Sequence, residues 1–470
     1  MTNLEADAAF GDRIRAGTIV RPLKSGDGNA VEQRGGKPMQ ETSAPPRVVG
    51  KIGATLMSIN GMIGAGIFAL PGLLYSKAGN FAPWMFLIFG LLFASSILIA
   101  ARLSQMFRAS GGPQLWTQAA FGPFVGFQAG WILVLAMAGG RAATLNVLVG
   151  YLAVILPILA EPAWRAGALA VLLATLTLVT ISGMKNCVAG LAIGTVLKVV
   201  PILMLCGAAY AAGGIATTFV LPEFGTFESV ALLVYFAYSG AEIATSSAGE
   251  LKNPRRDLPI TMLASLAIII LFYMAVQWAY IAAGAPDSEG EAPLAAAAGV
   301  VMGPSGTLLL SLAAIFSIGT NSLNFYIAGP RIVYSMAERG LLPAALAGVS
   351  VRFRSPHRAI VLFSAIVVIM LASGTFAFLA TVTSLGDQFI GLVCIAAFVV
   401  LMRRRHGAHD GVLKARWWPA SMVTGGFAIF NLMQAPASAF LFLGGLLAAG
   451  TGLYCTAGRG RVVAPEPILD

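Results

Sequence analysis

The stretch Asn60-Gly61-Met62-Ile63-Gly64-Ala65-Gly66-Ile67-Phe68 places three glycines in the middle of a segment that is otherwise apolar enough to cross a membrane. Backbone N–H and C=O groups have no water to bind inside a bilayer, so a spanning helix is interrupted only where protein, a cavity or a ligand satisfies them. Glycine also tolerates backbone conformations that end a helix. The stretch therefore predicts a broken membrane helix with a binding site at the break.

The composition is that of a polytopic membrane protein. Of the 470 residues, 57% are hydrophobic and 11% charged. Apolar runs of about 18 residues or more indicate spanning helices, so we expect an all-α fold with about twelve spans, with an error of about one. Their expected ranges are 51–75, 82–103, 122–155, 164–182, 187–213, 227–248, 258–283, 305–337, 358–376, 379–402, 417–435 and 437–456.

The charged residues sort by side of the membrane. The N-terminal tail and alternate loops are rich in Lys and Arg, whereas the opposite loops are nearly bare of them. The positive-inside rule then predicts a multi-pass protein of the cytoplasmic, or inner, membrane with both termini in the cytoplasm. Residues 1–48 are polar and lack apolar periodicity, which predicts a disordered tail, and 457–470 form a C-terminal tail. The net charge of +10 thus reflects topology in a lipid bilayer rather than a nucleic-acid partner.

A second interruption is expected in the sixth span, where Tyr235-Phe236-Ala237-Tyr238-Ser239-Gly240-Ala241-Glu242 brings Gly and a carboxyl group into an apolar helix. The two breaks lie five spans apart, so the spans run in opposite directions. Breaks at corresponding positions point to an inverted-repeat transporter with its site at the membrane midplane.

The broken ends suggest the chemistry of the ligand. N–H groups at Gly64, Ala65 and Gly66 would face a carboxylate at a positive helix end. Carbonyls near Met62, Phe236 and Ser239 would accept from a cation, which together fits an amino acid. The alternative is that these glycines only allow close helix packing.

Several motifs resemble the amino acid/polyamine/organocation (APC) superfamily. They are Gly61–Phe68 with Pro71, Glu242 followed by 248–259, Ser110–Pro113 with Phe121–Pro123, and 337–343. The resemblance covers roughly residues 48–456. It implies a leucine-transporter-type core of five plus five inverted helices, at about 51–213 and 227–402, with two further helices at about 417–456. It also implies transport of amino acids or related amines.

The resemblance also suggests which residues line the pocket. Its side-chain end is expected to include Phe236, at a position that is an aromatic gate in the family, with Ala237, Tyr238, Ile67 and Asn324. Ser239 and Gly240 belong to the same break. Plain packing is the alternative for the aromatic residues.

We count three charged side chains well within the predicted spans, Arg141, Lys198 and Glu242, each costly at that depth. Lys198 resembles a fifth-span lysine that stands in for sodium beside the first span. Because burial disfavours the charged form of lysine, it could carry a coupled proton; alternatively it is a permanently charged strut. Glu242 has a gating, structural or coupling role.

Arg141 forms an internal pair, with Glu242 or another partner, or faces the cavity and disfavours cationic substrates. With no other carboxylate expected near the site, neutral amino acids are favoured.

Other function classes find little support in the sequence. It has no histidine cluster, metal-ligand spacing or phosphate-binding motif, so neither an enzyme nor a metal or cofactor is expected. A channel would need a selectivity ring, and a non-transporting amino acid sensor is less favoured. We therefore expect a secondary transporter working by alternating access, as a proton-coupled symporter or as an exchanger with Lys198 as a strut. The sequence leaves open whether it is a monomer or a homodimer.

Overall fold

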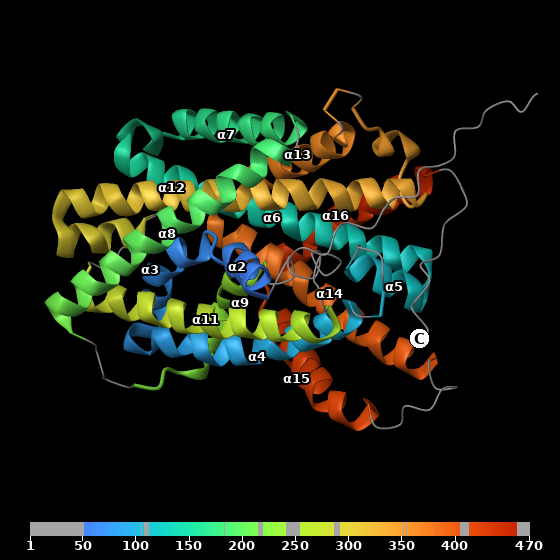
Figure 1. Cartoon of the computed structure of the whole chain (residues 1–470), viewed down its shortest axis with the longest axis horizontal. Coiled ribbons are helices and arrows are strands. Elements are labelled where there is room, and N and C mark those ends of the chain that lie inside the picture. Colours follow the sequence, from blue (N-terminus) through green and yellow to red (C-terminus); the bar gives the residue numbers. More distant parts are fainter. Residues whose placement is uncertain are drawn as a thin grey trace, which may run out of the picture. The chain divides into compact units, whose positions relative to one another are not determined.

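The computed structural model describes residues 51–104, 106–107, 112–182, 184–214, 220–240, 254–285, 292–350, 352–353, 355–404 and 413–457. Regular structure in these ranges is helical, without a strand (Figure 1). Seven helical stretches are long and apolar enough to cross a membrane. The predicted all-α polytopic membrane protein is confirmed.

Seven α-helices lie in the described part of the first half of the chain. They are α2 (Lys51–Met62), α3 (Gly66–Ala78), α4 (Ala82–Ser104), α5 (Pro113–Phe121), α6 (Pro123–Ile155), α7 (Pro162–Ser182) and α8 (Met184–Gly213). The first predicted span is thus divided into α2 and α3. The short helix α5 lies between predicted spans and was not expected.

The described part of the second half holds seven more α-helices. They are α9 (Phe224–Tyr238), α11 (Pro254–Ala282), α12 (Pro293–Glu338), α13 (His357–Leu371), α14 (Phe376–Arg404), α15 (Leu413–Met433) and α16 (Ala437–Thr456). α12 consists of two helical pieces, of which the first begins at Pro293 and the second near Pro304, next to the start predicted at 305. Gly303, at φ +68°, interrupts it before Pro304, so two helical pieces run into one another.

Gly-Pro pairs begin two consecutive helices. Gly112 and Gly122 have φ of +55° and +92°, and each precedes the proline that starts α5 or α6. Proline suits the first helical position because its missing N–H has no helical partner there, while glycine tolerates the positive φ. The chain therefore turns sharply between α5 and α6, which pack against each other.

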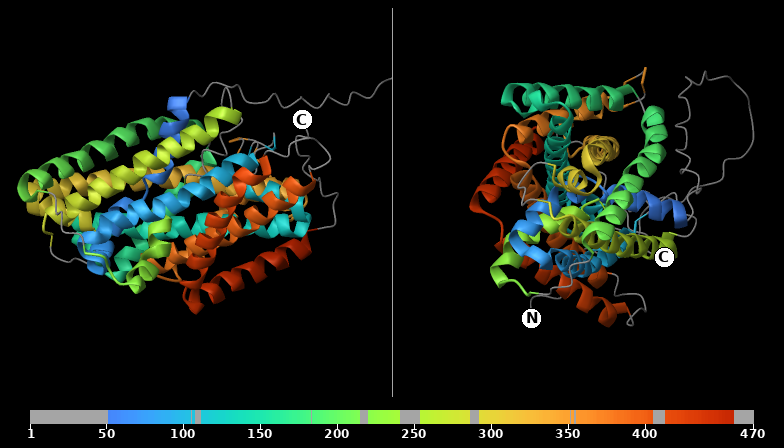
Figure 2. Two further views of the ribbon diagram at one scale, coloured as in Figure 1. Left: turned by 90° about the horizontal axis from the view of Figure 1, so that it is seen from below. Right: turned by 90° about the vertical axis from the view of Figure 1, so that its left-hand side faces the viewer.

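α6 lies at the centre of the packing. It contacts α12, α13 and α14 and is buried along most of its length, whereas α7 is mostly exposed (Figures 1 and 2). Large apolar side chains are exposed on outer helices, including Val171, Leu178, Val361, Met422 and Leu441. An exposed apolar surface of this kind suits contact with lipid.

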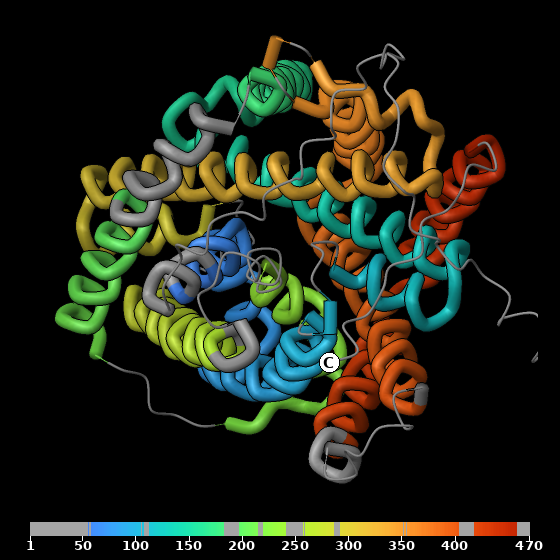
Figure 3. The backbone as a smooth tube through the Cα atoms, turned by 45° about the vertical axis from the view of Figure 1, so that its right-hand side comes forward, coloured from blue at the N-terminus to red at the C-terminus, as the bar shows by residue number. Residues whose placement is uncertain are grey.

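The broken first span is enclosed by other helices. α3 contacts α4, α9, α11 and α12, while α2 contacts α11 and α12, as the blue segment in Figure 3 shows. α4 also packs on α9. Both broken ends therefore lie inside the helical packing rather than at its edge.

Candidate binding site at the broken helices

The first break is short and sharply defined. α2 ends at Met62, α3 begins at Gly66, and residues 63–65 between them form a bend. Gly64 N donates a hydrogen bond to Met62 O at 2.8 Å. The amides of Ala65 and Gly66 lie at the start of α3, where helical N–H groups lack partners within their own helix. A positive helix end therefore faces the space between the two broken spans.

The end of α9, in the predicted sixth span, lies directly against this break. α9 stops at Tyr238, and Ser239 N bonds back to Phe236 O at 3.2 Å. Gly240 has φ +108°, and a Cβ there would lie 2.6 Å from Gly61 O. Only glycine allows this backbone approach. The continuation of the predicted break, including Glu242, lies outside the described residues.

The two breaks also touch through Gly66. A Cβ on Gly66 would lie 3.0 Å from the Cα of Ala237 and 3.2 Å from its Cβ. At Gly64, a Cβ would come 3.1 Å from Asn321 Oδ1. The glycines therefore do allow close packing, and the packing joins the two broken spans to each other.

Side chains from neighbouring helices bind the freed carbonyls. On α11, the Tyr273 hydroxyl lies 2.8 Å from Met62 O and 3.1 Å from Ala237 O. On α12, Asn321 Nδ2 donates to Gly61 O at 3.0 Å and to Asn60 O at 3.3 Å. These contacts satisfy carbonyls that the interrupted helix leaves open.

Lys198 on α8 reaches the same segment. It is fully buried, and its Nζ donates to Asn60 O at 3.3 Å, to Ile63 O at 3.4 Å and to the side-chain oxygen of Asn60. The side-chain nitrogen of Lys198 therefore lies among oxygens of the first break. Lys198 is not among the residues that line the two cavities described below.

Arg141 on α6 binds the amide oxygen of Asn321, whereas the amide nitrogen of Asn321 binds the carbonyls of the first break. Its Nη1 donates to Asn321 Oδ1 at 2.7 Å, and its guanidinium carbon lies 3.8 Å above the centre of the Phe325 ring. Asn321 thereby connects Arg141 to the carbonyls of the first break. Arg141 is also among the residues that line the cavity described below.

A cavity of about 30 Å³ lies between the broken ends. It is lined by many of the predicted residues, namely Met62, Gly64, Ala65, Gly66, Arg141, Phe236, Ala237 and Ser239. Ile67, Gly240 and Asn324 are not part of the lining. Ile67 is fully buried in the core, and Asn321 takes the place expected for Asn324. The Tyr238 hydroxyl points instead to Phe86 O at 2.6 Å.

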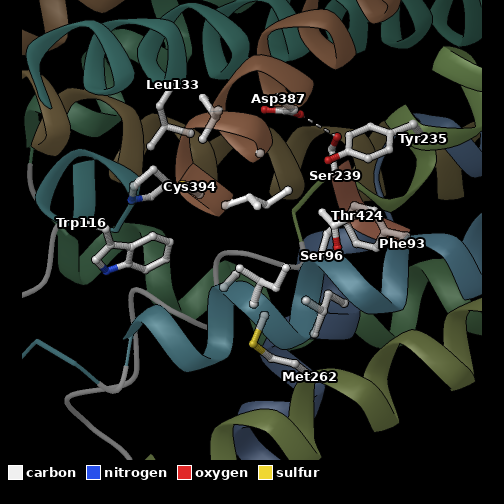
Figure 4. Close-up of a pocket in the computed structure, with 17 residues that line it drawn as sticks. Phe93, Ser96, Trp116, Leu133, Tyr235, Ser239, Met262, Asp387, Cys394 and Thr424 are labelled. Atoms are coloured by element: carbon white, nitrogen blue, oxygen red, sulfur yellow. Dashed lines mark hydrogen bonds between the residues drawn. The ribbon is translucent and has the colours of Figure 1, made fainter. Parts of the chain in front are cut away.

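A second, larger cavity of about 110 Å³ adjoins the first (Figure 4). The two cavities share Ser239 and Asp387 in their linings. Elsewhere the larger one is mainly apolar, with Phe93, Trp116 and Leu133 in its wall. A passage between the cavities would run along the two shared side chains.

Asp387 corrects two sequence-based statements. It lies within the predicted span 379–402, so the count of three intramembrane charges was wrong. Its position beside the cavity also contradicts the argument that no further carboxylate lies near the site. The sequence signal was present, since an aspartate in an apolar span is rare and usually functional.

Comparisons with known proteins agree on one family. The family model described as amino acid permease matches residues 50–453. The serine/threonine exchanger SteT of Bacillus subtilis is 26% identical over 344 residues, 70% of this chain and 78% of its own. The methylthioribose transporter of Bacillus subtilis is 25% identical over 452 residues, 89% and 96% of the two chains. The branched-chain amino acid permease BcaP of that organism is 25% identical over 394 residues, 76% and 81% of the two chains.

Proposed function

Because the chain belongs to the amino acid permease family, we propose that it carries amino acids across a membrane by alternating access around the cavity at its broken helices. The observation that carries this proposal is the meeting of the start of α3 with the end of α9. Gly66 packs on Ala237 there, and Gly240 packs on Gly61. Broken spans that meet within a helical bundle are the usual location of a transported ligand.

The carboxylate and ammonium groups, which all α-amino acids share, bind to the broken ends of the helices. The substrate's carboxylate faces the N–H groups of Ala65 and Gly66 at the positive end of α3. Its ammonium faces the carbonyls at the ends of α2 and α9, where such groups accept hydrogen bonds. Both interactions use the backbone, so they suit any α-amino acid.

The charge of the lining supports a neutral side chain. Arg141 and Asp387 contribute one positive and one negative side chain to the cavity wall. A net charge on the substrate would disturb this balance in a region of low dielectric constant. Two of the relatives are named for neutral amino acids, serine and threonine in one and branched-chain amino acids in the other.

There are two candidate modes of coupling, and they differ in the role of Lys198. In the first, the protein is a proton symporter in which Lys198 releases its proton when one side of the site opens. Its position on carbonyls of the first break supports this, because the loss of its charge would loosen α2.

In the second mode the protein is an exchanger and Lys198 is a permanently charged strut. Its absence from the linings of both cavities favours this reading. Such a lysine holds the first break in the same geometry in the outward-open and inward-open states, and no proton leaves the protein.

Uptake of radiolabelled amino acids into proteoliposomes tests the proposal. Uptake driven by an imposed pH gradient supports symport, and uptake that requires internal amino acid supports exchange. Protein-free liposomes and liposomes with collapsed gradients are the controls. Absence of uptake across the full set of amino acids would overturn the transport function itself.

We also propose that the protein lies in the cytoplasmic membrane with both termini in the cytoplasm, with residues 1–48 as a tail outside the transport domain at 49–456. The distribution of Lys and Arg among the loops supports this orientation. Protease digestion of a tag at residue 1 in inside-out and right-side-out vesicles tests it. Cleavage in right-side-out vesicles alone would contradict the assignment.

A further inference from the structure

Asp387 places a carboxylate at the boundary of the two cavities. It lies on α14, and the hydroxyl of Ser239, next to the end of α9, donates a hydrogen bond to its Oδ2 at 3.1 Å (Figure 4). Both residues line both cavities. A substrate whose main chain binds at the break would therefore extend its side chain past this carboxylate.

α14 packs closely against α6 near Asp387. A Cβ on Gly139 of α6 would lie 2.8 Å from Thr383 Oγ1, and one on Gly386 would lie 3.3 Å from the Cβ of Ala136. Thr383 and Gly386 lie in the helical turn of α14 that directly precedes Asp387. The two helices are therefore closely packed next to Asp387.

The charged side chains that line the cavities determine which chemical groups of a ligand bind favourably beside Asp387. Arg141 and Asp387 are the charged side chains among the described residues that line the two cavities, and Arg141 is bonded to Asn321 at the first break. A hydrogen-bond donor beside Asp387 forms a strong, charge-assisted bond. A second carboxylate there meets like-charge repulsion, and an apolar group offers this carboxylate no hydrogen bond.

We propose that Asp387 is a specificity-determining residue that accepts a hydrogen bond from the side chain of the transported amino acid. It selects hydroxyl and amide side chains over apolar or acidic side chains of the same size. This inference rests on the proposed function, since it concerns the side chain of an amino acid bound at the broken helices.

Isosteric amino acids test the inference directly. Full-length protein in proteoliposomes takes up whichever labelled amino acid the wild type transports best, against unlabelled threonine, valine, asparagine or aspartate as competitors. We expect threonine to compete about tenfold better than valine, and asparagine about tenfold better than aspartate, as is typical of one hydrogen bond to a charged group.

The variant Asp387→Asn should lower the threonine-to-valine preference towards one. It should also improve competition by aspartate about tenfold, because Arg141 then supplies the charge that aspartate meets. Glu228→Gln is the matched control. It removes a carboxylate from α9 that does not line either cavity, and both ratios should stay at their wild-type values.

A second variant covers the case in which Asp387→Asn does not fold. Ser239→Ala removes the internal donor but keeps the carboxylate, so the preference for threonine over valine should rise. Wild-type ratios near one, or ratios that neither variant changes, would overturn the inference while uptake itself still supports the proposed function. A wild type that transports no amino acid would overturn both.

Discussion

The hydroxyl of Tyr273 lies 2.8 Å from the carbonyl oxygen of Met62, the last residue of α2. The same hydroxyl lies 3.1 Å from Ala237 O, near the end of α9. One side chain of α11 therefore contacts the freed backbone of both broken spans. This ties the geometry of one break to that of the other.

Replacing Tyr273 with phenylalanine removes this contact and keeps the ring. We expect a loss of about 1–3 kcal/mol, the cost of a buried carbonyl without its donor, seen as a lower melting temperature of the purified protein and weaker uptake. Tyr454→Phe on α16, away from both cavities, is the control. Equal effects of the two substitutions would show that Tyr273 has no special role.

A side chain introduced at position 66 in place of Gly66 should push the two broken spans apart. An added Cβ would be 3.0 Å from the Cα of Ala237, and overpacking of this kind typically costs about 1–3 kcal/mol. We expect Gly66→Ala to reduce substrate affinity and Gly66→Leu to abolish binding, measured by equilibrium binding to the purified protein. Gly207→Ala on α8 is the control, because nothing lies within 4 Å of its added Cβ. Unchanged affinity in a folded Gly66→Leu protein would contradict the placement of the substrate.

Asn321 and Asn324 offer a matched pair on α12. Asn321 binds Arg141 and the carbonyls of Asn60 and Gly61, whereas Asn324 does not line the cavity. Asn321→Ala should raise the KM for uptake at least tenfold, since it leaves buried polar groups without this partner. Asn324→Ala should have a much smaller effect. The opposite ranking would restore Asn324 as the pocket residue expected from the sequence.

Lys198→Ala distinguishes the two coupling modes. If Lys198 carries the proton, the variant should lose uptake driven by a pH gradient while it retains exchange of internal for external amino acid. If Lys198 is a strut, both activities should fall together as the first break loses a cation bonded to its carbonyls. Lys77→Ala is the control, because Lys77 is exposed at the end of α3. Full gradient-driven uptake by Lys198→Ala would refute the carrier role.

A substitution at Gly450 tests how closely α16, the last described helix, packs against α6. Trp131 Nε1 on α6 donates to Leu446 O on α16 at 3.0 Å, and a Cβ on Gly450 would collide with the same indole ring. We expect Gly450→Ala to destabilise the protein by about 1–3 kcal/mol, measured as a lower melting temperature. Gly444→Ala on the same helix has open space around its Cβ and should leave stability unchanged. Equal melting temperatures would mean that α16 shifts without cost.

The first break could be predicted from the sequence because glycine and the bilayer act locally. Three glycines in an apolar run suffice to place the end of α2 and the start of α3. The choice between Asn321 and Asn324 could not be made in this way, because it depends on how α12 is rotated about its axis. Tyr273 gave no signal, since an aromatic residue in an apolar helix usually serves packing.

Polar side chains anchor the first span almost entirely through its main chain. Besides Tyr273, Asn321 and Lys198, Tyr151 binds Phe68 O at 2.8 Å and Gln277 binds Pro71 O at 3.0 Å. Such anchors do not depend on which side chains the span itself carries. Met62, which lines the cavity, can therefore be varied in a combinatorial library to search for new cargo, while these backbone contacts are retained in each member.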